Sequence, residues 1–205
     1  WEMAENDILE AVKEKKIKYS IEYGEAAFYG PKLDFMVKDS LNRKWQLGTI
    51  QVDYQLPERF KLDYITENNT KQTPVVIHRA PFGSLERFVA LLTEHCYGNF
   101  PFWLAPIQMT ILSISDKFNS YSNKIFKSLS KLNLRVIQDI RSEKISKKIR
   151  DAELKKIPYM IIIGENELKS NKISLRKHTE GDLGKMSLDD LISTLKKEKN
   201  VIINN

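Results

Sequence analysis

The sequence predicts an α/β fold in two parts, an antiparallel sheet followed by a mixed sheet flanked by helices. Two observations lead to this prediction. Between residues 18 and 77 the apolar residues follow a period of two and short turns join the strand-like runs, which is typical of an antiparallel sheet. From residue 107 onwards apolar strand-like runs alternate with helical patterns, which indicates a mixed or parallel sheet with helices on both faces.

The first part begins with a helix and continues as strands. Ile8, Leu9 and Val12 have the spacing of an amphipathic helix. After it, the alternation changes to that of a hairpin whose turn is Leu41-Asn42-Arg43-Lys44. In chain order we expect strands at 32–40, 44–54, 61–67 and 73–80, and then a helix from Ser84, its N-cap, to about Tyr97.

A break at residues 98–106, "GNFPFWLAP", separates the two parts. Its two prolines, glycine and asparagine interrupt both helices and strands, so we expect domains at 1–104 and 105–205. In the second domain we expect strands at 107–114, 134–140, 158–164 and 171–177, and helices at 117–132, 146–156 and 187–198.

The composition is typical of a soluble intracellular protein, and we expect a cytoplasmic location. The single cysteine, Cys96, excludes an intramolecular disulfide. No apolar run approaches the roughly 20 residues that span a bilayer, and no secretory signal precedes the first helix, so no membrane partner is expected. The chain begins with Trp1 inside a helical pattern and looks like a piece of a longer protein.

Charge is distributed unevenly between the two parts. Residues 1–104 contain 13 Lys and Arg against 15 Asp and Glu, whereas residues 105–205 contain 20 against 12. A basic second half suggests a polyanion such as RNA as its partner. A solvated lysine-rich surface is the alternative that charge alone leaves open.

Several polar residues of the first part could contact an anion or a small ligand. Arg79 and Arg87 flank a Pro-Phe-Gly turn, and arginine suits phosphate because its donors form a fork. His78 ends an apolar strand, where it could be a metal ligand, an acid–base group or a packed histidine, and the pattern alone favours the packed histidine. Gln46 and Gln51 could reach one pocket only if Gly48 marks a bulge or sharp twist, because their odd spacing places them on opposite faces of a regular strand.

Polar residues of the second part stand at strand and loop ends, where α/β sheets bind ligands. A carboxylate among cations can accept hydrogen bonds from RNA bases while the cations bind phosphates. A surface network of salt bridges is the alternative. The residues in question are Arg141, Lys144, Glu167 and Arg176.

Sequence blocks along essentially the whole chain resemble one family. These blocks are "YGEAAFYGPKLDF", "WQLGTIQVDYQLPERF", "VVIHRAPFGSLERF", "FPFWLAPIQ", "EKISKKIRDAELKKIPYMIIIG" and "GDLGKMS". In order and spacing they are similar to the C-terminal portion of bacterial-type threonyl-tRNA synthetases. The resemblance implies the end of a class II catalytic domain built on an antiparallel sheet, followed by an α/β anticodon-binding domain with a mixed sheet.

The resemblance also implies a reaction and its residues. Threonine attacks the α-phosphate of ATP, a substrate that carries magnesium, and the threonyl group then passes to threonine tRNA. Arg87 would hold the adenine, Lys32 would stabilise charge near the phosphates, and His78 would be one of three protein ligands of a zinc ion that recognises threonine. The other two zinc ligands would lie upstream of this chain. The expected pocket residues are Tyr29, Gln46, Gln51, Ala80, Gly83 and Ser84.

In the second domain the resemblance assigns anticodon contacts to Arg141, Lys144, Glu167 and Arg176. Ser142 stands where many relatives have asparagine. The complete enzyme would be a homodimer, and the first two class II motifs would lie outside this chain, so we expect the chain alone to be inactive. The alternative is a non-catalytic RNA-binding or accessory protein that retains a synthetase-like C-terminus.

Overall fold

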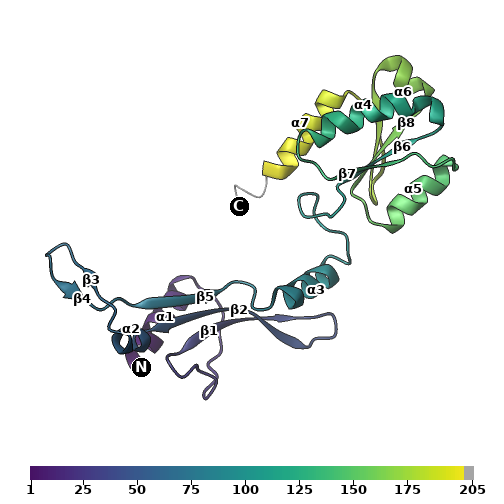
Figure 1. The fold of residues 1–205 in the computed structure, drawn as a ribbon. Helices are drawn as coiled ribbons and strands as arrows, with labels where there is room; N and C mark the ends of the chain where they lie inside the picture. Colours follow the sequence, from purple (N-terminus) through teal and green to yellow (C-terminus); the bar gives the residue numbers. More distant parts are fainter. Residues whose placement is uncertain (201–205) are drawn as a thin grey trace. The chain divides into compact units, whose positions relative to one another are not determined.

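A computed structural model describes residues 1–200, without the side chains of Lys197, Lys199 and Asn200. The chain groups into two compact units, unit 1 (Trp1–His95) and unit 2, which begins at Cys96 (Figure 1). Residues 96–106 contain neither helix nor strand, and the predicted domain limits of 1–104 and 105–205 stay a prediction.

Unit 1 is built on a three-stranded antiparallel sheet of order β1-β2-β5, as the period-two pattern predicts (Figure 1). Helix α1 packs through its buried residues Ala4 and Val12. Segments 61–67 and 73–80, both expected to be strands, form shorter ones. The elements are α1 (Glu2–Glu14), β1 (Lys32–Lys38), β2 (Lys44–Asp53), α2 (Gln55–Arg59), β3 (Tyr64–Ile65), β4 (Lys71–Gln72), β5 (Val76–Ala80) and α3 (Leu85–His95).

The turn between β1 and β2 is organised by one buried carboxylate. Asp39 accepts hydrogen bonds from the backbone N–H groups of Leu41 and Arg43, both at 2.9 Å. Asn42 lies in the left-handed region with φ of 61°, which asparagine tolerates better than most residues. The hairpin therefore forms where the sequence predicts it.

Unit 2 contains a mixed five-stranded sheet of order β10-β9-β8-β6-β7, as expected (Figure 1). Strand β6 runs parallel to β7 and β8, while β9 is antiparallel to β8 and β10. The elements are β6 (Met109–Ser113), the 3-10 helix η1 (Asp116–Phe118), α4 (Asn119–Ser130), β7 (Val136–Asp139), α5 (Ile145–Leu154), β8 (Tyr159–Ile163), α6 (Glu165–Ser170), β9 (Ile173–Lys177), β10 (Gly181–Met186) and α7 (Leu188–Asn200).

Alternating residues of the unit 2 strands pack against helices on opposite faces. Ile161 faces α4 and α7, where it joins a buried cluster with Leu129 and Leu191. Its neighbour Met160 faces α5 and packs with Ala152. We call these two surfaces the α4–α7 face and the α5 face of the sheet.

Helices α2 and α6 and strands β4 and β10 have no counterpart in the sequence prediction. Asp53 starts α2 by accepting the N–H groups of Gln55 and Leu56, each at 2.9 Å. Strand β10 contains two glycines and no apolar alternation, and it forms because it pairs with β9 along that edge.

In the part of the chain that the structure describes, no helix is long and apolar enough to cross a membrane.

Candidate functional site

The predicted pocket residues of unit 1 meet on one face of its sheet. Lys32 on β1, Gln51 on β2 and His78 on β5 pair across the three strands and form a single row. Paired residues of adjacent strands point to the same face. The next row on that face consists of Asp34, Thr49 and Ala80. We call this surface the site face.

A β-bulge brings Gln46 to the site face. Phe35 pairs with Gly48 and Met36 pairs with Gln46, so Leu47 is the extra residue in β2. This bulge shifts the alternation of β2 by one position, as the spacing of Gln46 and Gln51 requires. The side-chain amide of Gln46 then donates to Asp34 Oδ1 at 2.6 Å.

The turn before β1 places Tyr29 beside both Gln51 and His78. Its hydroxyl donates to Gln51 Oε1 at 2.7 Å, and its ring centroid lies 5.0 Å from that of His78. Gly30 permits this approach, because a Cβ there would lie 2.4 Å from the carbonyl oxygen of Val52. The three side chains form one cluster that the sequence pattern alone does not connect.

His78 is oriented by a buried carboxylate. Its Nε2 lies 2.9 Å from Oδ2 of Asp53, whose side chain is fully buried. Burial opposes ionisation of Asp53, but hydrogen bonds from the N–H of Leu56, from His78 and from the N–H of Gln55 outweigh it and hold its pKa below the ordinary value. An ionised carboxylate only accepts hydrogen bonds, so Nε2 carries the hydrogen and the neutral ring has its lone pair on Nδ1.

The geometry of His78 fits one ligand of a metal site. A metal-binding histidine commonly donates its other ring N–H to a carboxylate, as His78 does to Asp53. Among residues 1–200 the structure contains no group of three or more His, Cys, Asp and Glu side chains that could hold a metal ion. A zinc ion bound by His78 would therefore need ligands from outside the described chain.

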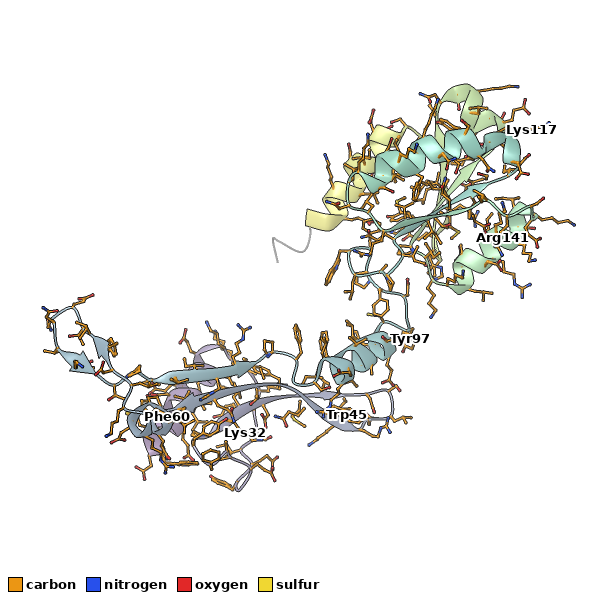
Figure 2. All side chains as sticks on the ribbon, viewed as in Figure 1. Lys32, Trp45, Phe60, Tyr97, Lys117 and Arg141 are labelled. Carbon is orange, nitrogen blue, oxygen red and sulfur yellow. The ribbon has the colours of Figure 1, made fainter. Side chains whose placement is uncertain are left out.

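Lys32 lies at the edge of the same cluster and is paired with an acid. Its Nζ is 2.7 Å from Oδ2 of Asp34, and both side chains are about four-fifths buried. Asp34 thereby joins Lys32 to Gln46, because its other oxygen accepts the amide of Gln46. Lys32 is labelled on β1 in Figure 2.

The start of α3 packs over the bulge. Ser84 caps the helix by accepting the N–H of Arg87 at 3.3 Å. Gly83 has φ of 60°, and a Cβ there would lie 2.4 Å from the carbonyl oxygen of Leu47, so this position requires glycine. The guanidinium of Arg87 donates to the carbonyl oxygen of Gln46 at 3.0 Å. One residue of the bulge therefore contacts both Arg87 and the site face.

The four candidate residues of unit 2 lie around the α5 face. Arg141, which is labelled in Figure 2, follows β7. It forms ion pairs with Asp139 at 2.6 Å and Asp151 at 2.8 Å. Hydrogen bonds to Asp139 and then Asp151 raise the pKa of Arg141 above its ordinary value. Lys144 is exposed and is the N-cap residue of α5.

Glu167 and Arg176 lie on the other side of the α5 face. Glu167 is buried and accepts hydrogen bonds from the N–H of Gly164 at 3.0 Å and from the hydroxyl of Ser174 at 2.9 Å. Arg176 is two residues beyond Ser174 on β9, and its Nε is buried without a hydrogen-bond partner among the described residues. Within the described chain, no hydrogen bond or ion pair joins these two residues to Arg141 or Lys144.

Three residues of the candidate site escaped sequence reasoning. Asp34 and Asp53 bind predicted site residues, and Trp45 packs against Arg87. Of these three, only Asp34 could have been found from local sequence, because it lies two residues from Lys32 in the same alternating strand and therefore on the same face. Asp53 is far from His78 in sequence, and only the pairing of β2 with β5 brings the two together.

Comparisons with known proteins place both units in one family context. Residues 3–96 match the family model of the tRNA synthetase class II core domain (G, H, P, S and T), and residues 107–198 match that of an anticodon binding domain. The chain is 58% identical over 198 residues to a threonine–tRNA ligase of Porphyromonas gingivalis, covering 97% of the chain and 30% of that relative. It is 56% identical over 204 residues to a threonine–tRNA ligase of Phocaeicola vulgatus, covering 100% of the chain and 32% of that relative.

A solved structure agrees with these relatives. The chain is similar to the RNA binding domain of threonyl-tRNA synthetase from Cryptosporidium parvum, with a TM-score of 0.91 and 40% identity. The match covers 97% of this chain and 50% of that structure. The chain spans about a third of the length of the curated relatives that it matches.

Proposed function

We propose that the chain supplies part of the activation site and the anticodon-binding domain of a threonine–tRNA ligase. The basis is that the chain belongs to the threonyl-tRNA synthetase family. In the complete enzyme the carboxylate of threonine attacks the α-phosphate of ATP, forming threonyl-adenylate and releasing pyrophosphate. The threonyl group then passes to the terminal ribose of threonine tRNA. The observation that carries this proposal is the single row of Lys32, Gln51 and His78 on the site face.

The threonine side of the site consists of Tyr29, Gln46, Gln51 and His78. Tyr29 holds Gln51 through its hydroxyl, so the amide group of Gln51 is presented in one orientation. Asp53 holds His78 so that Nδ1 is available to a zinc ion completed by ligands from elsewhere in the enzyme. When bound, zinc would accept both the amino and the hydroxyl group of threonine, whereas valine has no hydroxyl and would leave one coordination position unfilled.

The ATP side of the site consists of Arg87, with Lys32 near the phosphates. Arg87 has a planar cation that can stack on adenine, and Lys32 supplies a positive charge near the α-phosphate of the magnesium-bound nucleotide. Ala80, Gly83 and Ser84 form the wall between the two sides, since they connect β5 to α3.

Unit 2 would contact the anticodon of threonine tRNA across the α5 face. Arg141, Lys144 and Arg176 supply positive charge, and the buried Nε of Arg176 has no hydrogen-bond partner within the described residues. Glu167 is already committed to Gly164, Ser174 and Lys185, so its contact with a base would involve the remaining acceptor capacity of its oxygens.

The complete enzyme would act as a cytoplasmic homodimer. The chain alone would not activate threonine, because the arginine for the α-phosphate and two zinc ligands lie outside it. Robust threonine-dependent pyrophosphate exchange by the 205-residue chain would contradict this part of the proposal.

The test uses the complete protein that contains this chain. We expect threonine-dependent pyrophosphate exchange, and we expect His78→Ala to lower it at least about 100-fold together with the zinc content. Lys71→Ala, which removes an exposed ion pair with Asp63, is the matched control and should change neither value. A complete protein that binds threonine tRNA but catalyses no exchange would favour the non-catalytic accessory protein instead.

A further inference from the structure

Arg87 is held by two contacts that the sequence did not predict, one with the ring of Trp45 and one with the backbone of Gln46. Its guanidinium carbon lies 5.8 Å from the ring centroid of Trp45, within the range of a cation–π contact. One of its terminal nitrogens donates to the carbonyl oxygen of Gln46 at 3.0 Å. The ring and the carbonyl together restrict the orientation of a long side chain that would otherwise sample many rotamers.

Trp45 is in turn fixed by the hairpin between β1 and β2. Its indole N–H donates to Oδ2 of Asp39 at 3.0 Å, and the Asp39 side chain is only 1% exposed. The same carboxylate holds the backbone of Leu41 and Arg43 in the turn. The ring position therefore follows from the turn geometry, and Figure 2 shows Trp45 on this hairpin.

The charge of Arg87 remains uncompensated in this arrangement. Arg43 also lies over the Trp45 ring, at 5.7 Å, but its charge is paired with Asp39 through a 2.6 Å contact. Within residues 1–200 no salt bridge involves Arg87, and the residue is exposed. Arg87 is thus held in position by neutral groups, while its positive charge is free to act on a ligand.

We propose that Trp45 is a positioning residue for ATP, because its ring holds the guanidinium of Arg87 in the orientation that receives the adenine. This inference rests on the proposed function, in which Arg87 contacts the adenine. In this role Trp45 acts through Arg87 and not by its own contact with the nucleotide. Its effect is to lower the conformational cost of ordering Arg87 when ATP binds.

Steady-state pyrophosphate exchange by the complete protein tests this role. We expect Trp45→Leu to raise KM for ATP about 3- to 10-fold, while kcat and KM for threonine change by less than about twofold. Trp45→Phe retains an aromatic face and should recover most of the loss. Trp103→Leu removes an exposed tryptophan of unit 2 and should leave all three constants unchanged.

Arg87→Ala in the same assay separates this inference from the proposed function. If Arg87→Ala raises KM for ATP and both Trp45 variants leave it unchanged, the role of Trp45 is wrong and the proposed function stands. If Trp45→Leu raises both KM values and Trp45→Phe recovers neither, Trp45 is only structural and the inference is overturned. If Arg87→Ala itself leaves KM for ATP unchanged, the proposed role of Arg87 fails, and this inference fails with it.

Discussion

Unit 1 and unit 2 differ in how much apolar side chain they bury. Apart from prolines and glycines, Ala4 and Val12 are the only buried apolar residues of unit 1, every residue of which the structure describes. The described part of unit 2 contains 16 such residues. In unit 2 helices cover both faces of the sheet. Burial of apolar surface is the dominant favourable contribution to folding, so the two units differ in their capacity to fold alone.

The apolar residues of unit 1 lie largely on the side of the sheet opposite the site face. Phe35 is 42% exposed and Ile77 is 65% exposed, and both alternate with site-face residues of their strands. Helix α3 likewise has no buried residue, with Leu85 and Val89 both at least half exposed. Unit 1 therefore contains an ordered set of polar site residues without a complete core beneath it, and we infer that it needs further polypeptide to be stable.

The largest expected effect is on the folding of the separate units. Residues 96–205 alone should unfold in one cooperative thermal transition, because the core of unit 2 lies within them. Residues 1–95 alone should show no cooperative transition and should bind a hydrophobic dye. Calorimetry and dye fluorescence measure both properties. A cooperative transition in the isolated unit 1 would show that its exposed apolar residues do not limit its stability.

A core substitution tests whether buried apolar residues are the source of the stability of unit 2. Leu129 is fully buried in α4, and Leu129→Ala should lower the free energy of unfolding by about 3–5 kcal/mol, since it removes apolar contacts and leaves a cavity. Leu132→Ala, just beyond α4 and 39% exposed, is the control and should cost less than about 1 kcal/mol. Urea unfolding of unit 2 measures both. Equal losses would mean that the core is not the source of its stability.

A substitution on the α5 face tests whether the two units have separate tasks. Arg176→Ala in the complete protein should weaken binding of threonine tRNA about 10-fold and leave pyrophosphate exchange unchanged. Lys169→Ala removes a positive charge from exposed helix α6, where it pairs with Glu165, and is the matched control. An equal loss of tRNA binding and exchange would contradict the division between the units.

Periodicity predicted most of the helices and strands, because local spacing determines which residues can share a face. It also indicated that Gln46 and Gln51 needed an irregularity near Gly48, and the bulge at Leu47 supplies it. The partners of His78 and Arg87 could not be predicted in this way. Asp53 and Trp45 reach them only through strand register and the return of α3 over β2, which depend on the whole sheet.

Glu167 shows a different reason why sequence reasoning was incomplete. A carboxylate among cations was expected to face RNA, but most of its hydrogen-bonding capacity is used inside unit 2. Burial alone would raise the pKa of Glu167, but hydrogen bonds from Ser174, Lys185 and Gly164 hold it below the ordinary value. Composition and spacing do not distinguish a carboxylate that caps a helix from one that is available to bind a ligand.

The units should also respond to opposite extremes of pH. In unit 2, burial and a 2.5 Å hydrogen bond to Glu198 raise the pKa of Tyr159 above its ordinary value of 10.0. A raised pKa means that the protonated hydroxyl stabilises the folded state fully below pH 10 and that this contribution is lost as the pH rises beyond it. The melting temperature of unit 2 should fall above pH 10, and Tyr159→Phe should make the melting temperature depend less on pH in this range. Unchanged alkali sensitivity in the variant would exclude Tyr159 as its source.

In unit 1 the corresponding group is Asp39, whose pKa is lowered, so its stabilising contribution is lost at low pH. The hydrogen bond from the Trp45 indole lowers its pKa most, burial opposes this, and Arg43 and Leu41 add further donors, so the pKa falls from 3.8 to about 2. The folded-state pKa lies below the unfolded value, so the stabilisation of the hairpin is complete above about pH 4 and is lost as the pH falls through about 2. The NMR signal of the Trp45 indole N–H in the complete protein should titrate near pH 2. A midpoint near 3.8 would mean that the indole does not hold Asp39 ionised, and the fixed position of Trp45 beside Arg87 would then lack its support in the turn.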